Sequence, residues 1–138
     1  MTKDLWISIP VKDIDRAVAF YTAVGFTLNP HYPQTTQSAS FFVGTKPFVL
    51  MLFDDHTFSH LSGNTVADTQ AGTEMLISLD AETREEVDAY ASKAEQAGGI
   101  VFGKPSEVQG WMYGCGFTDP DGHRWNALYM DMTRMPKG

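Results

Sequence analysis

Apolar residues in the first half of the chain follow two different spacings. Residues Leu5–Val11 form a short apolar run rich in β-branched side chains, which predicts a strand. Between Asp13 and Gly25 apolar positions recur every three to four residues, the spacing of an amphipathic helix. Asp13 is a typical N-cap residue, and Gly25 is a typical residue just beyond a helix end. Three further strand-like segments are predicted around residues 26–32, 38–43 and 48–53.

The same order of elements returns in the second half. A strand is predicted over Glu74–Leu79, and a helix that opens at Asp80 or Thr83 and closes at a Gly-Gly pair follows it. An Asp-Pro-Asp-Gly turn separates the last two segments, so we expect these to form a hairpin. The final three predicted strands cover Ile100–Phe102, Trp111–Phe117 and Trp125–Met130.

A repeat of element order is the most informative feature of the pattern. It predicts an α+β fold of two tandem βαβββ modules, at about residues 1–54 and 73–132, joined by a polar linker at about 55–72. We expect residues 1–138 to form a single domain of the two modules. Each module should contain a curved mixed sheet with its helix on one face, and the two sheets should enclose a cleft suited to a small molecule.

Charge and composition narrow the range of partners. The net charge is -7 and the Lys and Arg residues do not cluster, which argues against nucleic acid and against an anionic membrane surface. No apolar run approaches the ~20 residues that span a bilayer, and the N-terminus is not of the signal-peptide type. The single cysteine, Cys115, excludes an intrachain disulfide, so we expect a cytoplasmic protein.

Three segments of the chain carry a recognisable combination of residues: Ile9–Asp13 with Ala17–Tyr21, Val24–Phe26, and Phe117–His123. Together they resemble the vicinal-oxygen-chelate (glyoxalase/bleomycin resistance/dioxygenase) superfamily. The ending of the chain is similar to a bacterial subgroup related to lactoylglutathione lyase. The resemblance covers essentially the whole chain and implies the paired-module fold, which hosts many different activities.

The resemblance also implies four positions where metal-dependent relatives carry ligands, one on the first and one on the last strand of each module. In this chain Trp6, Met51, Glu74 and Asn126 occupy them. Tryptophan cannot ligate, and a thioether suits soft copper rather than the hard or borderline ions of this chemistry. Glu74 is the one good ligand, so we expect neither a metal nor another cofactor.

Glu74 is the candidate catalytic residue. In an apolar cleft, a carboxylate of raised pKa suits proton abstraction beside a carbonyl. An equally weighted interpretation places it near solvent at the start of a strand. The other three ligand positions and two alternate residues of a predicted strand are candidates for contact with a bound molecule, although each also suits a place in the core. These residues are Trp6, Met51, Trp111, Tyr113 and Asn126.

Three functions stay open on the sequence alone. The first is metal-independent binding of a small molecule in the cleft. The second is a lyase or isomerase that acts on a small carbonyl or thioester substrate with Glu74 as acid or base. The third is a metal-dependent lyase of the glyoxalase type. In each case we expect a homodimer, because relatives often complete the cleft across subunits and aromatic and Met residues, favoured at interfaces, are abundant.

Overall fold

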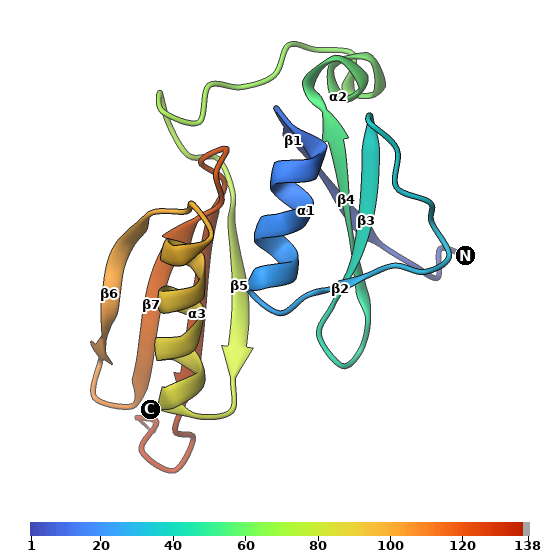
Figure 1. Ribbon diagram of the computed structural model, residues 1–138. Helices are drawn as coiled ribbons and strands as arrows, with labels where there is room; N and C mark the ends of the chain where they lie inside the picture. Colours follow the sequence, from blue (N-terminus) through green and yellow to red (C-terminus); the bar gives the residue numbers. More distant parts are fainter. Residues whose placement is uncertain (137–138) are drawn as a thin grey trace. The chain divides into compact units, whose positions relative to one another are not determined.

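In the computed structural model, which describes residues 1–136, the chain opens with strand β1 (Trp6–Val11) and helix α1 (Ile14–Ala23) (Figure 1). The carboxylate of Asp13 accepts a hydrogen bond from the backbone N–H of Arg16 over 3.2 Å, which confirms Asp13 as the N-cap. Gly25 has a φ of +106°, a conformation that glycine adopts without strain, and so ends the helix as predicted.

The first four-stranded sheet has the order β1-β4-β3-β2. β1 runs parallel to β4, and the other neighbours are antiparallel, so the sheet is mixed. A short helix, α2, follows the last strand. The elements after α1 are β2 (Thr27–Leu28), β3 (Ser38–Val43), β4 (Phe48–Asp54) and α2 (Asp55–Ser62).

The second sheet repeats this order as β5-β8-β7-β6, again with one parallel pair, β5 and β8. The two units therefore confirm the predicted pair of βαβββ modules. The chain forms two compact units, Met1–Asp68 and the residues from Thr69 onward. The elements of the second unit are β5 (Leu76–Ala81), α3 (Arg84–Gln96), β6 (Val101–Val108), β7 (Met112–Thr118) and β8 (Arg124–Met130).

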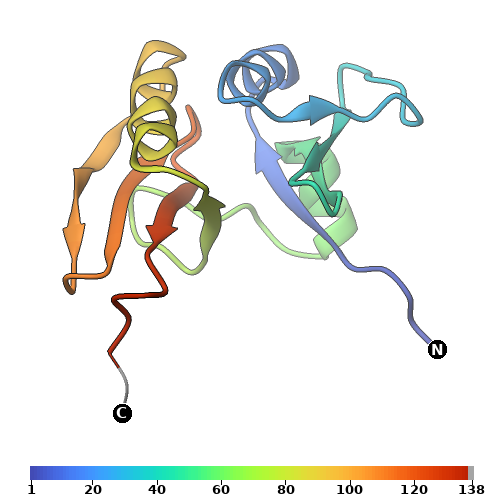
Figure 2. The same cartoon turned by 90° about the horizontal axis from the view of Figure 1, so that it is seen from below.

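In each module the helix lies on one side of its sheet, as Figure 2 shows. The ring of Phe41 on β3 lies 5.9 Å from the ring of Tyr21 on α1, and the Cys115 thiol on β7 contacts the backbone oxygen of Val87 on α3. Both cores lie on this helix side. The largest fully buried side chains there include Phe20, Tyr21, Phe41, Leu50, Phe117 and Trp125. We call the opposite side the helix-distal face of each sheet.

The predicted extents of β2 and β5 are wrong. β2 stops at Leu28, because Pro30 has no N–H for the ladder and the Asn29 side chain accepts a hydrogen bond from His31 N–H instead. β5 starts at Leu76 rather than at Glu74. Leu76 is in register with Arg124, the first residue of β8, so the residues before it have no partner strand.

The predicted extent of β6 is too short, and the linker contains a helix. β6 continues to Val108 although Gly103 and Pro105 interrupt the apolar pattern. It is an edge strand, and two register shifts along its pairing with β7 accommodate these residues. The linker predicted at about residues 55–72 begins with the eight-residue helix α2. Within residues 1–136, no helix is long and apolar enough to cross a membrane.

Candidate functional site

On the helix-distal face of the first sheet, Met51 lies in a row with two serines. Met51 on β4 is in register with Ser8 on β1 and Ser40 on β3. Met51 is 7% exposed and Ser40 only 1%. The Asn29 side-chain amide donates to the Ser40 hydroxyl over 3.2 Å. Met51 and Ser40 at the centre of this face are therefore buried, and the Ser40 hydroxyl is paired within the chain.

The segment between β2 and β3 supplies more of this pairing. The Tyr32 hydroxyl donates to the Ser38 hydroxyl over 3.2 Å, and the Thr35 hydroxyl lies 3.3 Å from the same oxygen. Ser38 is buried as well. The polar atoms on this half of the face therefore have partners in the chain and do not require a ligand.

Asn126 occupies the corresponding place on the second sheet. It is in register with Ser78 on β5 and with Gly116 on β7, as Met51 is with Ser8 and Ser40. The side-chain oxygen of Asn126 is buried and has no hydrogen-bond partner within residues 1–136. A buried polar atom without a partner is rare and costs free energy, which marks Asn126 as a candidate functional residue.

Trp6 and Glu74 lie away from these two rows. Trp6 pairs with Val49, two positions from Met51, and is 58% exposed. Glu74 is exposed and precedes β5, so the β5 residue beside Asn126 is Ser78. The structure thus places Glu74 as the alternative interpretation has it, before a strand and near solvent. Its side chain forms no hydrogen bond or ion pair within residues 1–136.

Tyr113 does not lie with Asn126. It pairs with Tyr129 and lies two residues before Cys115 on β7. Both side chains therefore lie on the same face of the strand, the one that α3 covers. Its hydroxyl donates to the Asp88 carboxylate over 2.7 Å, and this bond raises the pKa of Tyr113. Trp111 is half-buried in the turn before β7. Tyr113 was therefore predicted on the wrong face of β7, because residue spacing alone does not say which face of a strand the helix covers.

Sequence reasoning missed several residues of the helix-distal faces. The serines Ser8, Ser40 and Ser78 are small hydroxyl residues inside apolar strands, and only strand register reveals that they flank Met51 and Asn126. Arg124 lies two residues before Asn126, and this spacing was a usable signal since such residues share a face. Phe102 could not be found, because its position depends on the register shifts in β6.

Two mixed βαβββ sheets, each with a helix on one side and a partly polar helix-distal face, define a protein of two tandem βαβββ modules. A model of the Glyoxalase/Bleomycin resistance protein/Dioxygenase superfamily matches residues 5–127, and the chain belongs to this superfamily. No curated protein matches the sequence significantly.

Solved structures show the same relationship. A hypothetical protein from S. aureus, SA1046, is 31% identical, with a TM-score of 0.81 and 94% of each chain covered. A family enzyme from Burkholderia phytofirmans PsJN is 22% identical, with a TM-score of 0.75, covering 93% of this chain and 99% of its own. A lactoylglutathione lyase from Agrobacterium tumefaciens is 20% identical, with a TM-score of 0.68, covering 99% and 100%. The last two likenesses show the fold alone.

Proposed function

We propose that the protein binds a small molecule on the helix-distal faces of its sheets, without a metal ion. The observation that carries the proposal is the buried, unpartnered oxygen of Asn126 at the centre of the second face. A ligand that donates a hydrogen bond there removes the cost of leaving this atom unpaired. The chain belongs to a superfamily that includes bleomycin resistance proteins, which supports a function of binding a small molecule without catalysis.

The donor atoms around the two central positions do not fit a catalytic divalent ion. Met51 offers a thioether beside two hydroxyl groups, and Asn126 offers an amide beside Ser78 and Gly116. Octahedral ions of this chemistry favour carboxylate and imidazole ligands. Within residues 1–136, no group of three or more His, Cys, Asp or Glu side chains is placed to hold a metal. Neither central position therefore fits a catalytic divalent ion.

The enzymatic alternative depends on Glu74 as an acid or base on a small carbonyl or thioester substrate. Its exposed position before β5 gives it no apolar surroundings within its own module. A Glu74→Gln variant separates the two functions. Binding predicts unchanged ligand affinity, whereas acid-base chemistry predicts turnover of the bound compound that the substitution abolishes.

The binding function is tested by an NMR screen of the ¹⁵N-labelled protein against small aromatic and carbonyl compounds in the presence of EDTA. We expect at least one compound to shift the backbone amides around Gly116 and Asn126, with the same affinity after EDTA is replaced by manganese, nickel or zinc. Binding that appears only with a divalent ion contradicts the proposal. A screen without any shift on either helix-distal face also contradicts it.

We further propose that the protein is a homodimer in the cytoplasm. Trp6 and Leu76, the first residues of β1 and β5, are 58% and 51% exposed, and large exposed apolar side chains favour burial against a partner. The single buried thiol suits a reducing compartment. Sedimentation at micromolar concentration tests the assembly, and a monomer alone would contradict it.

A further inference from the structure

Three side chains of the second module converge on Gly116 from neighbouring strands. Gly116 on β7 lies between Asn126 on β8 and Gly103 on β6. The ring of Phe102 occupies the space above Gly116, since a Cβ atom built there would lie 2.4 Å from a ring carbon. Phe102 is nevertheless 47% exposed. The absence of a side chain at Gly116 is what allows the ring to lie on this part of the sheet.

Arg124 reaches the same place from β8. Its guanidinium carbon lies 4.4 Å from the centre of the Phe102 ring, a cation–π contact that holds the guanidinium over the ring. Within residues 1–136, Arg124 forms no ion pair and no side-chain hydrogen bond. In a chain with a net charge of -7, a half-buried cation without a carboxylate partner is an anion-binding group with free donors.

Asn126 supplies the complementary group. Arg124 and Asn126 are two residues apart on one strand, so they project to the same face about 7 Å apart at their Cα atoms. No side-chain hydrogen bond holds the Asn126 amide within residues 1–136, and its oxygen is the unpartnered atom. A half turn of the amide exchanges its oxygen and nitrogen, which brings the oxygen to the side of the amide that a ligand can reach.

We propose that the Gly116 site, formed by Gly116, Phe102, Arg124 and Asn126, binds a small carboxylate that carries a hydroxyl or amino group on the neighbouring carbon. The inference rests on the proposed binding function and names its ligand class. The Arg124 guanidinium holds the carboxylate through paired hydrogen bonds, and the Asn126 oxygen accepts from the hydroxyl or amino group. Sulfate fits less well, because an oxyanion without a hydrogen-bond donor repels the amide oxygen.

The apolar neighbours favour a ligand with a ring or branched group beside these polar ones. Phe102 forms one wall, and Leu128 covers Gly114 on the same face, where an added Cβ would lie 2.5 Å from the leucine side chain. A compound with an aromatic ring next to the carboxylate therefore buries apolar surface as it binds.

The test is an NMR titration of the ¹⁵N-labelled protein with three matched probes. Mandelate has the carboxylate, the α-hydroxyl and a phenyl ring; phenylacetate lacks the hydroxyl; and mandelamide lacks the charge. We expect mandelate to shift the amides of Phe102, Gly116 and Asn126 and to bind at least tenfold more tightly than either of the others.

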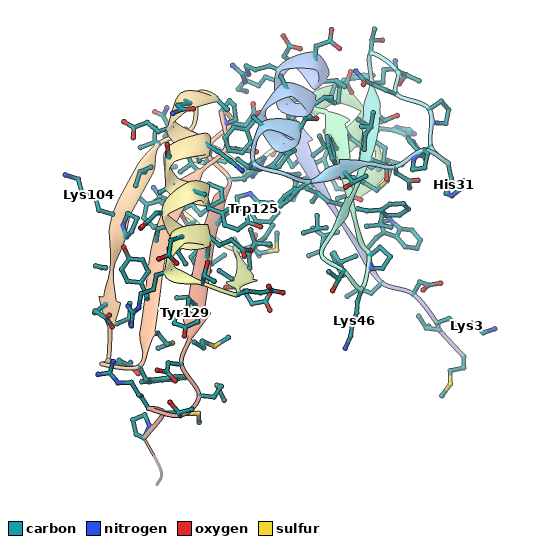
Figure 3. All side chains as sticks on the ribbon, turned by 60° about the horizontal axis from the view of Figure 1, so that its bottom comes forward. Lys3, His31, Lys46, Lys104, Trp125 and Tyr129 are labelled. Carbon is teal, nitrogen blue, oxygen red and sulfur yellow. The ribbon has the colours of Figure 1, made fainter. Side chains whose placement is uncertain are left out.

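Variants assign each part of the recognition. Arg124→Gln should lower the affinity for mandelate to that for mandelamide. Asn126→Leu should lower it to that for phenylacetate. Lys104→Gln is the matched control for charge, because Lys104 is exposed on β6 and its side chain projects away from the sheet (Figure 3). This control should bind mandelate as the parent does, and well-dispersed spectra confirm that each variant is folded.

The outcomes separate this inference from the proposed function. Equal affinity for all three probes, or loss of binding in Lys104→Gln as large as in Arg124→Gln, overturns the Gly116 site while small-molecule binding stands. No shift with any of the three probes also overturns it, and the wider screen described above then decides the binding function by itself.

Discussion

The two modules share one topology and use their helix-distal faces in opposite ways. In the first, Ser38 and Ser40 are buried, and hydrogen bonds from Tyr32 and Asn29 pair their hydroxyl groups. In the second, the equivalent centre contains Gly116 and an Asn126 oxygen without a partner. Duplicated strand order therefore does not imply duplicated chemistry, since register places different residue types at the same positions.

The two helix-distal faces differ because different chain segments lie next to them. The segment 29–37 carries Asn29, Tyr32 and Thr35 next to β3, so the first face is satisfied from within its own module. In the second module the corresponding edge strand is β6, whose register shifts direct the ring of Phe102 over Gly116. A ring stabilises a cation but accepts no ordinary hydrogen bond, so Arg124 and Asn126 remain available to a ligand.

The largest effect is expected in the cores, where the modules should behave alike. Trp125 on β8 and Leu50 on β4 hold equivalent positions beside Ile77 and Ile7, and both are fully buried. Trp125→Ala should lower the free energy of unfolding by about 3–5 kcal/mol and Leu50→Ala by about 2–5 kcal/mol. Urea denaturation followed by circular dichroism measures both. A loss below about 1 kcal/mol for either variant would show that the core of that module is not packed as described.

A smaller loss is expected where the first face is internally paired. Ser40→Ala removes the acceptor of the Asn29 side-chain amide and should cost about 1–3 kcal/mol in the free energy of unfolding. Ser8→Ala is the matched control. Ser8 lies in the same row without a side-chain hydrogen bond within residues 1–136, so the control should change stability by less than about 0.5 kcal/mol. Equal losses in the two variants would argue against the pairing.

The helix α2 gives the first module a pH-dependent helix cap directly after its last strand. The side chain of Asp54 caps α2, and hydrogen bonds from the Thr57 side chain and backbone hold its pKa below the usual value. A carboxyl whose folded pKa is depressed stabilises the protein above its unfolded pKa, near ~3.9, and this contribution disappears as the pH falls through the folded value.

Asp54→Ala should therefore cost about 1 kcal/mol at pH 7, and the difference from the parent should shrink as the pH falls through the folded pKa of Asp54. Asp54→Asn keeps a good capping residue and should be nearly as stable as the parent at pH 7. Thermal unfolding of the three proteins across acidic pH is the measurement. A cost for Asp54→Ala that does not depend on pH would contradict this role.

The smallest change in stability is expected at Asn126. Asn126→Leu removes a buried acceptor that has no partner, so we expect the free energy of unfolding to change by less than about 0.5 kcal/mol, or to rise. Chemical denaturation checks this against Ser40→Ala. A loss as large as that of Ser40→Ala would mean that Asn126 supports the fold, and the contrast between the two faces would then be lost.

Much of the local structure could be predicted from the sequence. Asp13 and Thr83 cap α1 and α3 through their own side chains, and both contacts depend on residues three positions apart. β3 has the predicted bounds, Ser38–Val43, because Gly and Pro punctuate the segments on either side of it. The tight turn that begins at Asp119 was also predictable, and Gly122 N–H donates to the Asp119 backbone oxygen.

The candidate site was less predictable. Met51 and Asn126 hold equivalent central positions. Glu74 was expected to share the site with Asn126, but β5 begins only at Leu76, where β8 starts, so Ser78 lies beside Asn126 instead. Tyr113 was expected beside the ligand and instead contacts Asp88 on α3. A strand pattern of period two separates two faces without naming them, and a shift by one residue exchanges them.

The sequence by itself thus determined the order of strands and helices, their caps and the existence of two modules, since these depend on neighbours within a few residues. Only the tertiary structure decided which side chains meet. Phe102, Arg124 and Asn126 come to Gly116 through strand pairings and register shifts between distant segments. Such pairings are set by the packing of whole strands, and no local pattern of residues records them.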